Sequence, residues 1–294
     1  MYTAFAVTCV TSSMFLTGLA PNLLALTLVQ KVAHVSISWS TWFFGFLPVG
    51  VILFLLVPFL LYKIYPPEIK QAPEAPIWAS EQLKTMGKIS RREITLLGLV
   101  VLALALWIKG TDFIDATATA VLVASLMVVF RVVSWDDVIG YKQAWNVLVW
   151  FATLVTMADG LAKVKFVDWI ANTIAPSFKR LDIIFAIILM VGVFFFLHYL
   201  FASLTAHTTA LLPVFLTVAI KIPGTPATIW ALLLSYTLGL MGILTPYATG
   251  PGPIYYASGY IKGRDFWLYG LVLGIVFFII YIAIGIPWLL SLGI

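Results

Sequence analysis

Long apolar runs separated by short polar links constrain this chain more than any other feature of its sequence. The run at 41–64 contains no charged residue before Lys63, and it is longer than the about 20 residues that a helix needs to cross a bilayer. Only helices and closed barrels satisfy their backbone polar groups inside lipid. Hydrophobic residues make up 62% of the 294 residues and charged residues 10%, so the pattern predicts an all-α polytopic membrane protein.

The charge and the cysteine content exclude several other classes of protein. The formal net charge is +5, but the basic residues lie in the links between apolar runs. This placement is typical of the control of membrane topology, so we expect no nucleic acid partner. The single cysteine, Cys9, excludes a disulfide framework and a thiolate metal cluster.

The apolar runs predict the order of the membrane segments. Residues 1–64 are predicted to hold a broken helix and one span, as the end of a first repeat. Residues 65–93 are predicted to form a loop, and its basic residues place that loop in the cytoplasm. Residues 94–294 are predicted to form a second repeat. Within it we expect spans at 94–108, 116–133 and 145–162, an interfacial stretch at 163–180, a re-entrant hairpin at 183–220, a broken helix at 226–261 and a last span at 266–292.

A polar island at 203–209 lies between two strongly apolar runs, 183–196 and 210–220. Its hydroxyl groups and the imidazole of His207 need partners at this depth, because hydrocarbon offers none. Polar, non-helical backbone is tolerated there only where it is buried in protein or lines a cavity. We therefore expect the island to be the tip of a hairpin that contacts a solute.

Two interrupted helices in corresponding positions indicate an internal repeat. The segment 17–22 reads TGLAPN and the segment 249–254 reads TGPGPI, so both follow the pattern T-G-x-small-P. A Trp-x-x-Gly unit follows each of them, at Trp42 and Trp267, and opens a long apolar span. Broken helices in matching positions of two halves point to the binding site of a transporter.

The spacing within the repeat also bears on the length of the chain. Ser203 precedes Thr249 by 46 residues, so the counterpart of Ser203 in the first repeat would lie about thirty residues before Met1. The sequence therefore predicts a C-terminal portion of a longer transporter, without the first hairpin.

The hairpin tip and the two breaks share one chemistry. Their hydroxyl groups are donors suited to carboxylate oxygens, and helix N-termini add positive potential near the centre of the bilayer. Carbonyl groups freed by Gly250, Pro251 and Pro253 could coordinate a small cation. The alternative, which stays open here, is that these small and hydroxyl-bearing residues only pack helices together. Three tyrosines flank the second break and could reach a cavity: Tyr247, Tyr255 and Tyr256.

The ionisable residues give little support to an enzyme. No acidic residue lies near His198 and His207 between Asp182 and Asp265, whereas a hydrolytic metal site needs three or four converging ligands. Asp159, near the end of an apolar run, has two open interpretations, a functional intramembrane carboxylate or an interfacial helix end. We expect neither an enzyme nor a bound prosthetic group.

Three stretches of the sequence resemble one known family. They are FLTGLAPNLLAL (15–26), HYLFASLTAHTTALLP (198–213) and LTPYATGPGPIYYASGYI (244–261). They are similar to the divalent anion:sodium symporter family, most of all to the branch of citrate, tartrate and 2-oxoglutarate/malate translocators. The likeness extends over all 294 residues, as the later part of that fold.

The resemblance implies two inverted repeats, each with a re-entrant hairpin and a broken helix, and an anionic substrate between the two hairpin tips. It also implies a homodimer in lipid and an elevator-like movement of the binding module. Leu204 stands where sodium-coupled members have Asn, which favours exchange over sodium coupling. The candidate substrate-binding residues are Ser203, Leu204, Thr205, His207, Thr17, Gly18, Pro21, Asn22, Thr249, Gly250 and Pro251, and a sodium site would involve Ala202, Ser203, Thr245 and Thr249.

These observations together predict secondary active transport of di- or tricarboxylates, such as malate, succinate, 2-oxoglutarate or citrate, across the inner membrane by anion exchange. Two alternatives stay open. One is a truncated, transport-inactive membrane fragment that only packs with a partner, and the other is a sodium-coupled dicarboxylate symporter. No catalytic residue is expected, and no cofactor apart from sodium in the symporter alternative.

Overall fold

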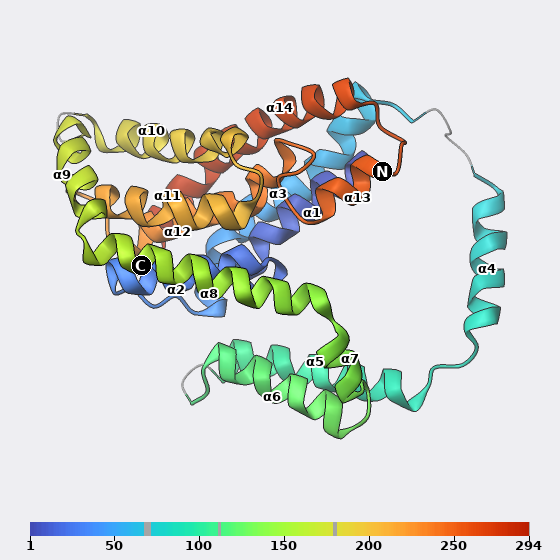
Figure 1. The fold of residues 1–294 in the computed structure, drawn as a ribbon. Coiled ribbons are helices and arrows are strands. Elements are labelled where there is room, and N and C mark those ends of the chain that lie inside the picture. The colour runs from blue at the N-terminus through green and yellow to red at the C-terminus, as the bar shows by residue number, and fades with distance from the viewer. Residues whose placement is uncertain (68–71, 111–112, 179–180, 294) are drawn as a thin grey trace. The chain divides into compact units, whose positions relative to one another are not determined.

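The computed structural model describes residues 1–67, 72–110, 113–178 and 181–293, and every regular element in these ranges is a helix (Figure 1). The chain divides into two compact units. The larger unit is formed by residues 1–61 and 148–294, and the smaller one by residues 62–147.

The larger unit holds most of the helices. They are α1 (Tyr2–Met14), the 3-10 turn η1 (Leu16–Gly18), α2 (Ala20–Ala33), most of α3 (Trp39–Ile64), most of α8 (Lys142–Lys163), α9 (Phe166–Phe178), α10 (Ile183–Phe196), the 3-10 turn η2 (Leu197–Leu200), α11 (Leu204–Ala219), α12 (Ala227–Leu240), the 3-10 turn η3 (Met241–Ile243), α13 (Pro251–Ala257), α14 (Gly263–Ile280), the π-helical turn η4 (Tyr281–Gly285) and α15 (Ile286–Ser291). The smaller unit holds α4 (Glu74–Met86), α5 (Arg91–Lys109), α6 (Ala116–Val129) and α7 (Trp135–Gly140).

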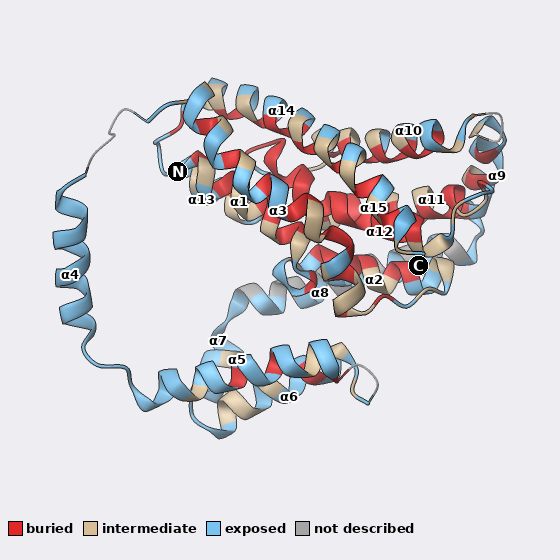
Figure 2. Cartoon of the chain, turned by 180° about the vertical axis from the view of Figure 1, so that it is seen from behind, coloured by how far each residue is buried: buried red, intermediate tan, exposed pale blue. Residues whose placement is uncertain are grey.

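Helix α12 forms the core of the larger unit. Every residue from Ile229 to Leu240 is buried (Figure 2). The helix contacts α1, α2, α10, α11, α14 and α15. A helix that is apolar around its whole circumference is stable when other helices surround it. The elements that form the candidate site therefore pack against one common core helix.

Helices α1 and α12, which lead into the two breaks, cross at close range. The hydroxyl group of Ser13 donates a 2.7 Å hydrogen bond to the carbonyl oxygen of Tyr236. The hydroxyl group of Tyr236 donates to the carbonyl oxygen of Trp42 at 2.8 Å, and the indole N–H of Trp42 donates to that of Ser13 at 2.9 Å. This buried network joins α1, α3 and α12.

The first break separates α1 from α2. Helix α2 begins at Ala20 with Pro21 in its first turn, where the missing N–H of proline costs no helical hydrogen bond. The side-chain amide of buried Asn22 donates to the carbonyl oxygens of Ser12 at 2.7 Å and Phe15 at 3.3 Å. The carbonyl groups released at the end of α1 thus regain partners inside the protein, as lipid depth requires.

The second break follows η3 and lasts until α13 begins. Two glycines allow the backbone to turn back tightly there. A Cβ on Gly252 would lie 2.7 Å from the carbonyl oxygen of Pro246, and one on Gly270 of α14 would lie 2.7 Å from that of Ile243. Either side chain would force the break open, so glycine is required at both positions.

Helices α10 and α11, joined by η2, occupy the segment predicted as the hairpin. Helix α11 has 16 residues and is therefore about 24 Å long, which is shorter than the about 30 Å hydrocarbon core. Among the described residues, three helical segments are long and apolar enough to cross a membrane, namely Trp39–Ile64, Ile183–Leu200 and Gly263–Ser291.

In the smaller unit, α5 and α6 pack against each other. Ser90 and Glu93 form a capping box at the start of α5, and the hydrogen bonds from the backbone N–H and side chain of Ser90 lower the pKa of Glu93. The indole N–H of Trp107 donates to the carbonyl oxygen of Ala116 at 3.1 Å. The ends of both helices are thus fixed by local contacts.

Helix α4 lies inside the segment 65–93, which the sequence predicts as a loop. Pro76 falls in its first turn, where its missing N–H breaks no helical hydrogen bond. The other residues of EAPIWASEQLKTM include several strong helix formers and no glycine. The prolines that suggest a loop therefore lie before the helix or in its first turn.

Candidate functional site

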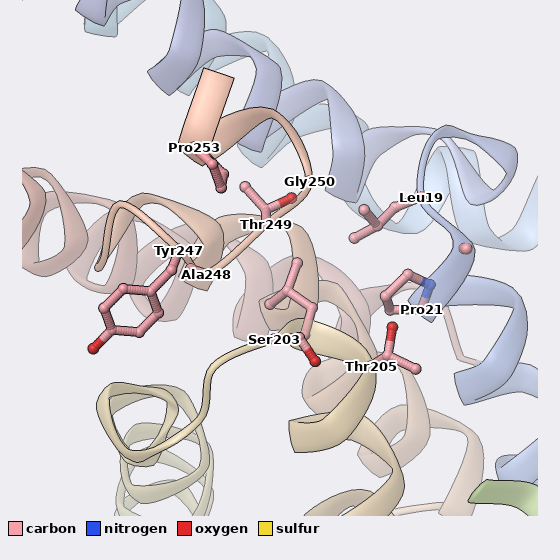
Figure 3. A pocket seen from close by; sticks show the side chains of 11 residues that line it. Leu19, Pro21, Ser203, Thr205, Tyr247, Ala248, Thr249, Gly250 and Pro253 are labelled. Atoms are coloured by element: carbon pink, nitrogen blue, oxygen red, sulfur yellow. The ribbon is translucent and has the colours of Figure 1, made fainter. Parts of the chain in front are cut away.

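A cavity of about 350 Å³ lies in the larger unit where the hairpin tip meets the two breaks (Figure 3). Three segments surround it: the start of α2, the start of α11 and the loop that leads into α13. Its lining residues are Leu19, Ala20, Pro21, Ser203, Leu204, Thr205, Tyr247, Ala248, Thr249, Gly250 and Pro253. No side chain in this set carries a formal charge, so a ligand would be held by hydroxyl groups and the backbone.

The hairpin tip is fixed to the second break by a backbone hydrogen bond. The N–H of Leu204 donates to the carbonyl oxygen of Ala248 at 3.1 Å. Ser203, the N-cap of α11, accepts a hydrogen bond from the N–H of Ala206 at 3.1 Å. The oxygen of Ser203 thus stabilises the helix start, and its proton stays available as a donor.

The hydroxyl groups in this region differ in whether they have a partner. Those of Thr208 and Thr209 donate to carbonyl oxygens within α11, at 2.7 and 2.9 Å. Those of Thr205 and Thr249 make no hydrogen bond within the part of the chain that the structure describes, and both residues line the cavity. In Figure 3 the Thr205 hydroxyl group points toward Pro21 of the first break. Two threonine hydroxyls at the cavity are therefore available to a ligand.

Two helix N-termini meet at the same cavity. Helices α2 and α11 have 14 and 16 residues, and the first residues of both line it. The backbone N–H of Thr205 makes no hydrogen bond to any described residue. The N-terminus of a helix of this length favours a negative charge, because of its unpaired N–H groups and the helix dipole. The neutral lining therefore suits an anion better than a cation.

Six of the predicted substrate-binding residues lie together at the cavity, namely Pro21, Ser203, Leu204, Thr205, Thr249 and Gly250. The other five lie outside its lining. Thr17 and Gly18 are exposed in η1, and Pro251 begins α13 just beyond the cavity. Asn22 is buried, where its amide holds the end of α1.

His207 is enclosed by aromatic rings. The centroid of its imidazole lies 4.5 Å from that of Phe194, 5.0 Å from that of Phe201 and 5.2 Å from that of His198. All four ring nitrogens of the two histidines are buried and have no hydrogen-bond partner among the described residues. Because His207 is polar, the sequence predicts that it binds the substrate. Its side chain, however, lies away from the cavity.

Five lining residues are absent from the predicted set. Leu19, Ala20, Ala248 and Pro253 contribute apolar surface or backbone, which a sequence pattern does not reveal. Tyr247 was one of three tyrosines expected to reach a cavity, and it lines this one. Its ring lies 5.8 Å from that of Trp267, centroid to centroid. The other two pack on phenylalanines instead, Tyr255 on Phe5 and Tyr256 on Phe266.

The predicted sodium residues are not all gathered at the cavity. Ser203 and Thr249 line it, while Ala202 and Thr245 do not. The hydroxyl group of Thr245 is buried and has no partner in the part of the chain that the structure describes. Among the described residues, no group of three or more His, Cys, Asp or Glu side chains is placed to hold a metal ion. The side chain of Asp159 lies outside the described residues.

Two broken helices and a helical hairpin that meet at a charge-free cavity are typical of secondary transporters. The model of the family described as the sodium:sulfate symporter transmembrane region matches residues 1–294. The chain belongs to this family, which confirms the predicted relationship to divalent anion:sodium symporters and the predicted all-α polytopic fold.

Two relatives illustrate the branch of the family. The chain is 49% identical over 280 residues to the citrate/succinate antiporter of Escherichia coli (strain K12), an alignment that covers 95% of the chain and 58% of the relative. It is 42% identical over 289 residues to the L-tartrate/succinate antiporter of the same strain, with coverage of 98% and 59%. The chain thus spans less than two thirds of the length of these relatives.

The family and these relatives confirm two broader predictions. The chain is a multi-pass protein of the inner membrane, and its relatives are transporters and not enzymes.

Proposed function

We propose that this chain forms the carboxylate-binding module of an anion exchanger, with a di- or tricarboxylate bound at the cavity. The observation that carries the proposal is the pair of unpartnered hydroxyl groups, on Thr205 and Thr249, beside the N-termini of α2 and α11. Hydroxyl and N–H donors suit carboxylate oxygens. The relatives named for citrate/succinate and tartrate/succinate exchange support the same class of substrate.

The absence of a charged side chain from the lining fits a transporter in particular. A buried Arg–carboxylate pair would hold an anion strongly, whereas a transporter has to release its cargo on each cycle. Malate, succinate, 2-oxoglutarate and citrate all present at least two carboxylates to such donors.

Exchange without sodium is the coupling that we propose. Leu204 brings an apolar side chain to the tip, and its N–H is engaged by the carbonyl oxygen of Ala248. The N–H of Leu204 repels a cation, and its side chain offers no oxygen to one. A sodium-coupled site would need oxygen ligands in its place.

The movement that we propose is an elevator-like displacement of the larger unit within a homodimer. All eleven lining residues belong to that unit, 1–61 with 148–294. A compact unit that contains the whole cavity can move with a bound anion without disrupting the binding site. The family resemblance supports the dimer and the type of movement.

Counterflow in proteoliposomes tests this function. The purified chain is reconstituted in vesicles loaded with unlabelled succinate, and uptake of labelled succinate, malate, 2-oxoglutarate, citrate and tartrate is measured in sodium or potassium buffer. We expect uptake that needs an internal carboxylate and is equal in both buffers. A sulfate-loaded vesicle is the control for leak.

The other outcomes separate the alternatives. Uptake that needs sodium would overturn the exchange mechanism and support a symporter. If the inserted chain shows neither counterflow nor thermal stabilisation by any carboxylate, the carboxylate site itself is wrong. A transport-inactive membrane fragment would then be the better description.

A further inference from the structure

Helix α4 has 13 residues, and none of its side chains is buried. Its large apolar side chains are strongly exposed, with Trp78 at 63%, Leu83 at 67% and Met86 at 78%. Single exposed apolar residues are normal, whereas a contiguous exposed apolar patch marks an interaction surface. The helix therefore has large apolar side chains that its own compact unit leaves uncovered.

Four apolar residues of α4 fall on one side of the helix. At 100° per residue, Ala75, Ala79, Leu83 and Met86 form a stripe within about 80° of one another, whereas Trp78 lies about 60° beyond Ala75, at the border with the polar side. The opposite side carries Glu74, Ser80, Glu81, Lys84 and Thr85, together with one apolar residue, Ile77. An amphipathic helix of this kind, with an aromatic residue beside the apolar stripe, suits the boundary between lipid and water.

The basic residues lie at one end of the same segment. Lys84, Lys88, Arg91 and Arg92 fall within nine residues that contain no acidic residue. Glu93, the next residue, is engaged in the capping box of Ser90. A basic cluster beside an apolar stripe is complementary to anionic lipid headgroups.

A short link joins α4 to α5, whose residues 94–108 the sequence predicts as a membrane span. Only residues 87–90 separate the last residue of α4 from Arg91, the first residue of α5. The five Cα–Cα steps of this link span at most roughly 18 Å. The C-terminal end of α4 is therefore held near the lipid surface at which the predicted span begins.

We propose that α4 is a lipid-docking helix that lies along the membrane surface. Its apolar face, formed by Ala79, Leu83 and Met86, enters the headgroup layer, and the basic cluster binds anionic phospholipid headgroups. This interaction surface is separate from the cavity and does not depend on the carboxylate that is bound there. It anchors the loop between α3 and α5 at the cytoplasmic face.

Spin labels on single introduced cysteines test the position of α4. The full chain, in nanodiscs that contain phosphatidylglycerol as the anionic lipid, carries a nitroxide at Leu83 or Met86 on the apolar face, or at Glu81 or Thr85 on the polar face. The native Cys9 is buried, and a sample without an introduced cysteine controls for its labelling. We expect the apolar-face labels to be relaxed by oxygen and the polar-face labels by a water-soluble nickel chelate.

A charge variant tests the headgroup contact. In Lys84→Gln/Lys88→Gln, we expect the ratio of docked to undocked α4, read from the Met86 label, to fall by roughly fivefold for each residue, because a basic residue near an anionic surface contributes about 1 kcal/mol. The matched control is Lys109→Gln, a lysine at the far end of α5. We expect the control to leave the ratio unchanged.

Three outcomes would overturn the proposal. Equal nickel accessibility at all four label positions would show that α4 lies in water. Apolar-face labels that neither oxygen nor nickel reaches would show that protein covers the helix, either a second copy or another chain. If α4 docks equally well to phosphatidylcholine alone, anionic headgroups do not contribute to its docking.

Discussion

The backbone N–H of Leu204 donates a hydrogen bond to the carbonyl oxygen of Ala248 at 3.1 Å, which joins the hairpin tip directly to the second broken helix. Leu204 is the first residue of α11, and Ala248 lies in the non-helical turn before α13. The two partners are far apart in the sequence and line the same cavity. The geometry of the cavity therefore depends on a contact between main-chain atoms.

Leu204→Pro tests this contact without disrupting the helix. Proline is favoured at the first helical position, and Ser203 has φ −158° and ψ 151°, which a following proline accepts. Leu204→Ala removes the same buried side chain but keeps the N–H. A hydrogen bond contributes about 1 kcal/mol, so we expect the proline variant to bind carboxylate roughly fivefold more weakly than the alanine variant. Equal affinities, measured by counterflow titration, would show that the bond does not position the tip.

Thr205→Val tests the hydroxyl donor at the cavity. Valine keeps the branched shape and loses only the hydroxyl group, which has no partner in the described chain. A hydrogen bond to a charged group contributes about 1.5–3 kcal/mol, so we expect half-saturation of uptake to rise by roughly 10-fold or more. Thr208→Val is the matched control, because that hydroxyl group donates to the carbonyl oxygen of Leu204 within the helix. A similar loss in both variants would point to damaged folding of α11 and would contradict the binding role of Thr205.

The breaks and the tip leave a chemical mark in the sequence. Glycine and proline within apolar runs show where a membrane helix has to stop. A Ser-x-Thr cluster between apolar arms is energetically unfavourable unless its hydroxyl groups find hydrogen-bond partners. Pro21, Ser203, Thr205 and Thr249 all carry such a mark, and all of them line the cavity.

The direction of a buried polar side chain is harder to predict. Asn22 and His207 have the same polarity as the lining residues, but the first holds the end of α1 and the second is enclosed by aromatic rings. Thr208 lies only three residues from Thr205, and the turn of the helix decides that its hydroxyl group bonds to the backbone. Ala248 contributes a carbonyl oxygen, which every residue has, so no pattern in the sequence singles it out.

Gly239→Ala tests the crossing of α1 and α12. A Cβ at this position would overlap the amide nitrogen and hydroxyl group of Ser13 and would lie 2.8 Å from the carbonyl carbon of Ser12. Overpacking of this kind costs about 1–3 kcal/mol, so we expect a lower melting temperature in detergent and weaker uptake. Gly98→Ala in α5 is the control, because a Cβ there meets no atom within 4 Å and alanine favours the helix by about 0.5–1 kcal/mol. Unfolding at the same temperature in both variants would show that the crossing is not tightly packed.

His207→Phe tests whether the buried imidazole takes part in binding. Its ring lies among Phe194, Phe201 and His198, and neither of its nitrogens has a partner within the described ranges. A phenyl ring fills a similar volume and removes two polar atoms whose burial without hydrogen bonds costs about 1–3 kcal/mol. We therefore expect His207→Phe to melt at the same or a higher temperature and to keep carboxylate counterflow. Phe194→Ala, which opens a cavity beside the same ring, should melt lower by comparison. If a His207→Phe protein of normal thermal stability loses counterflow, the imidazole does take part in binding. The hairpin would then have to adopt another state, in which His207 faces the substrate.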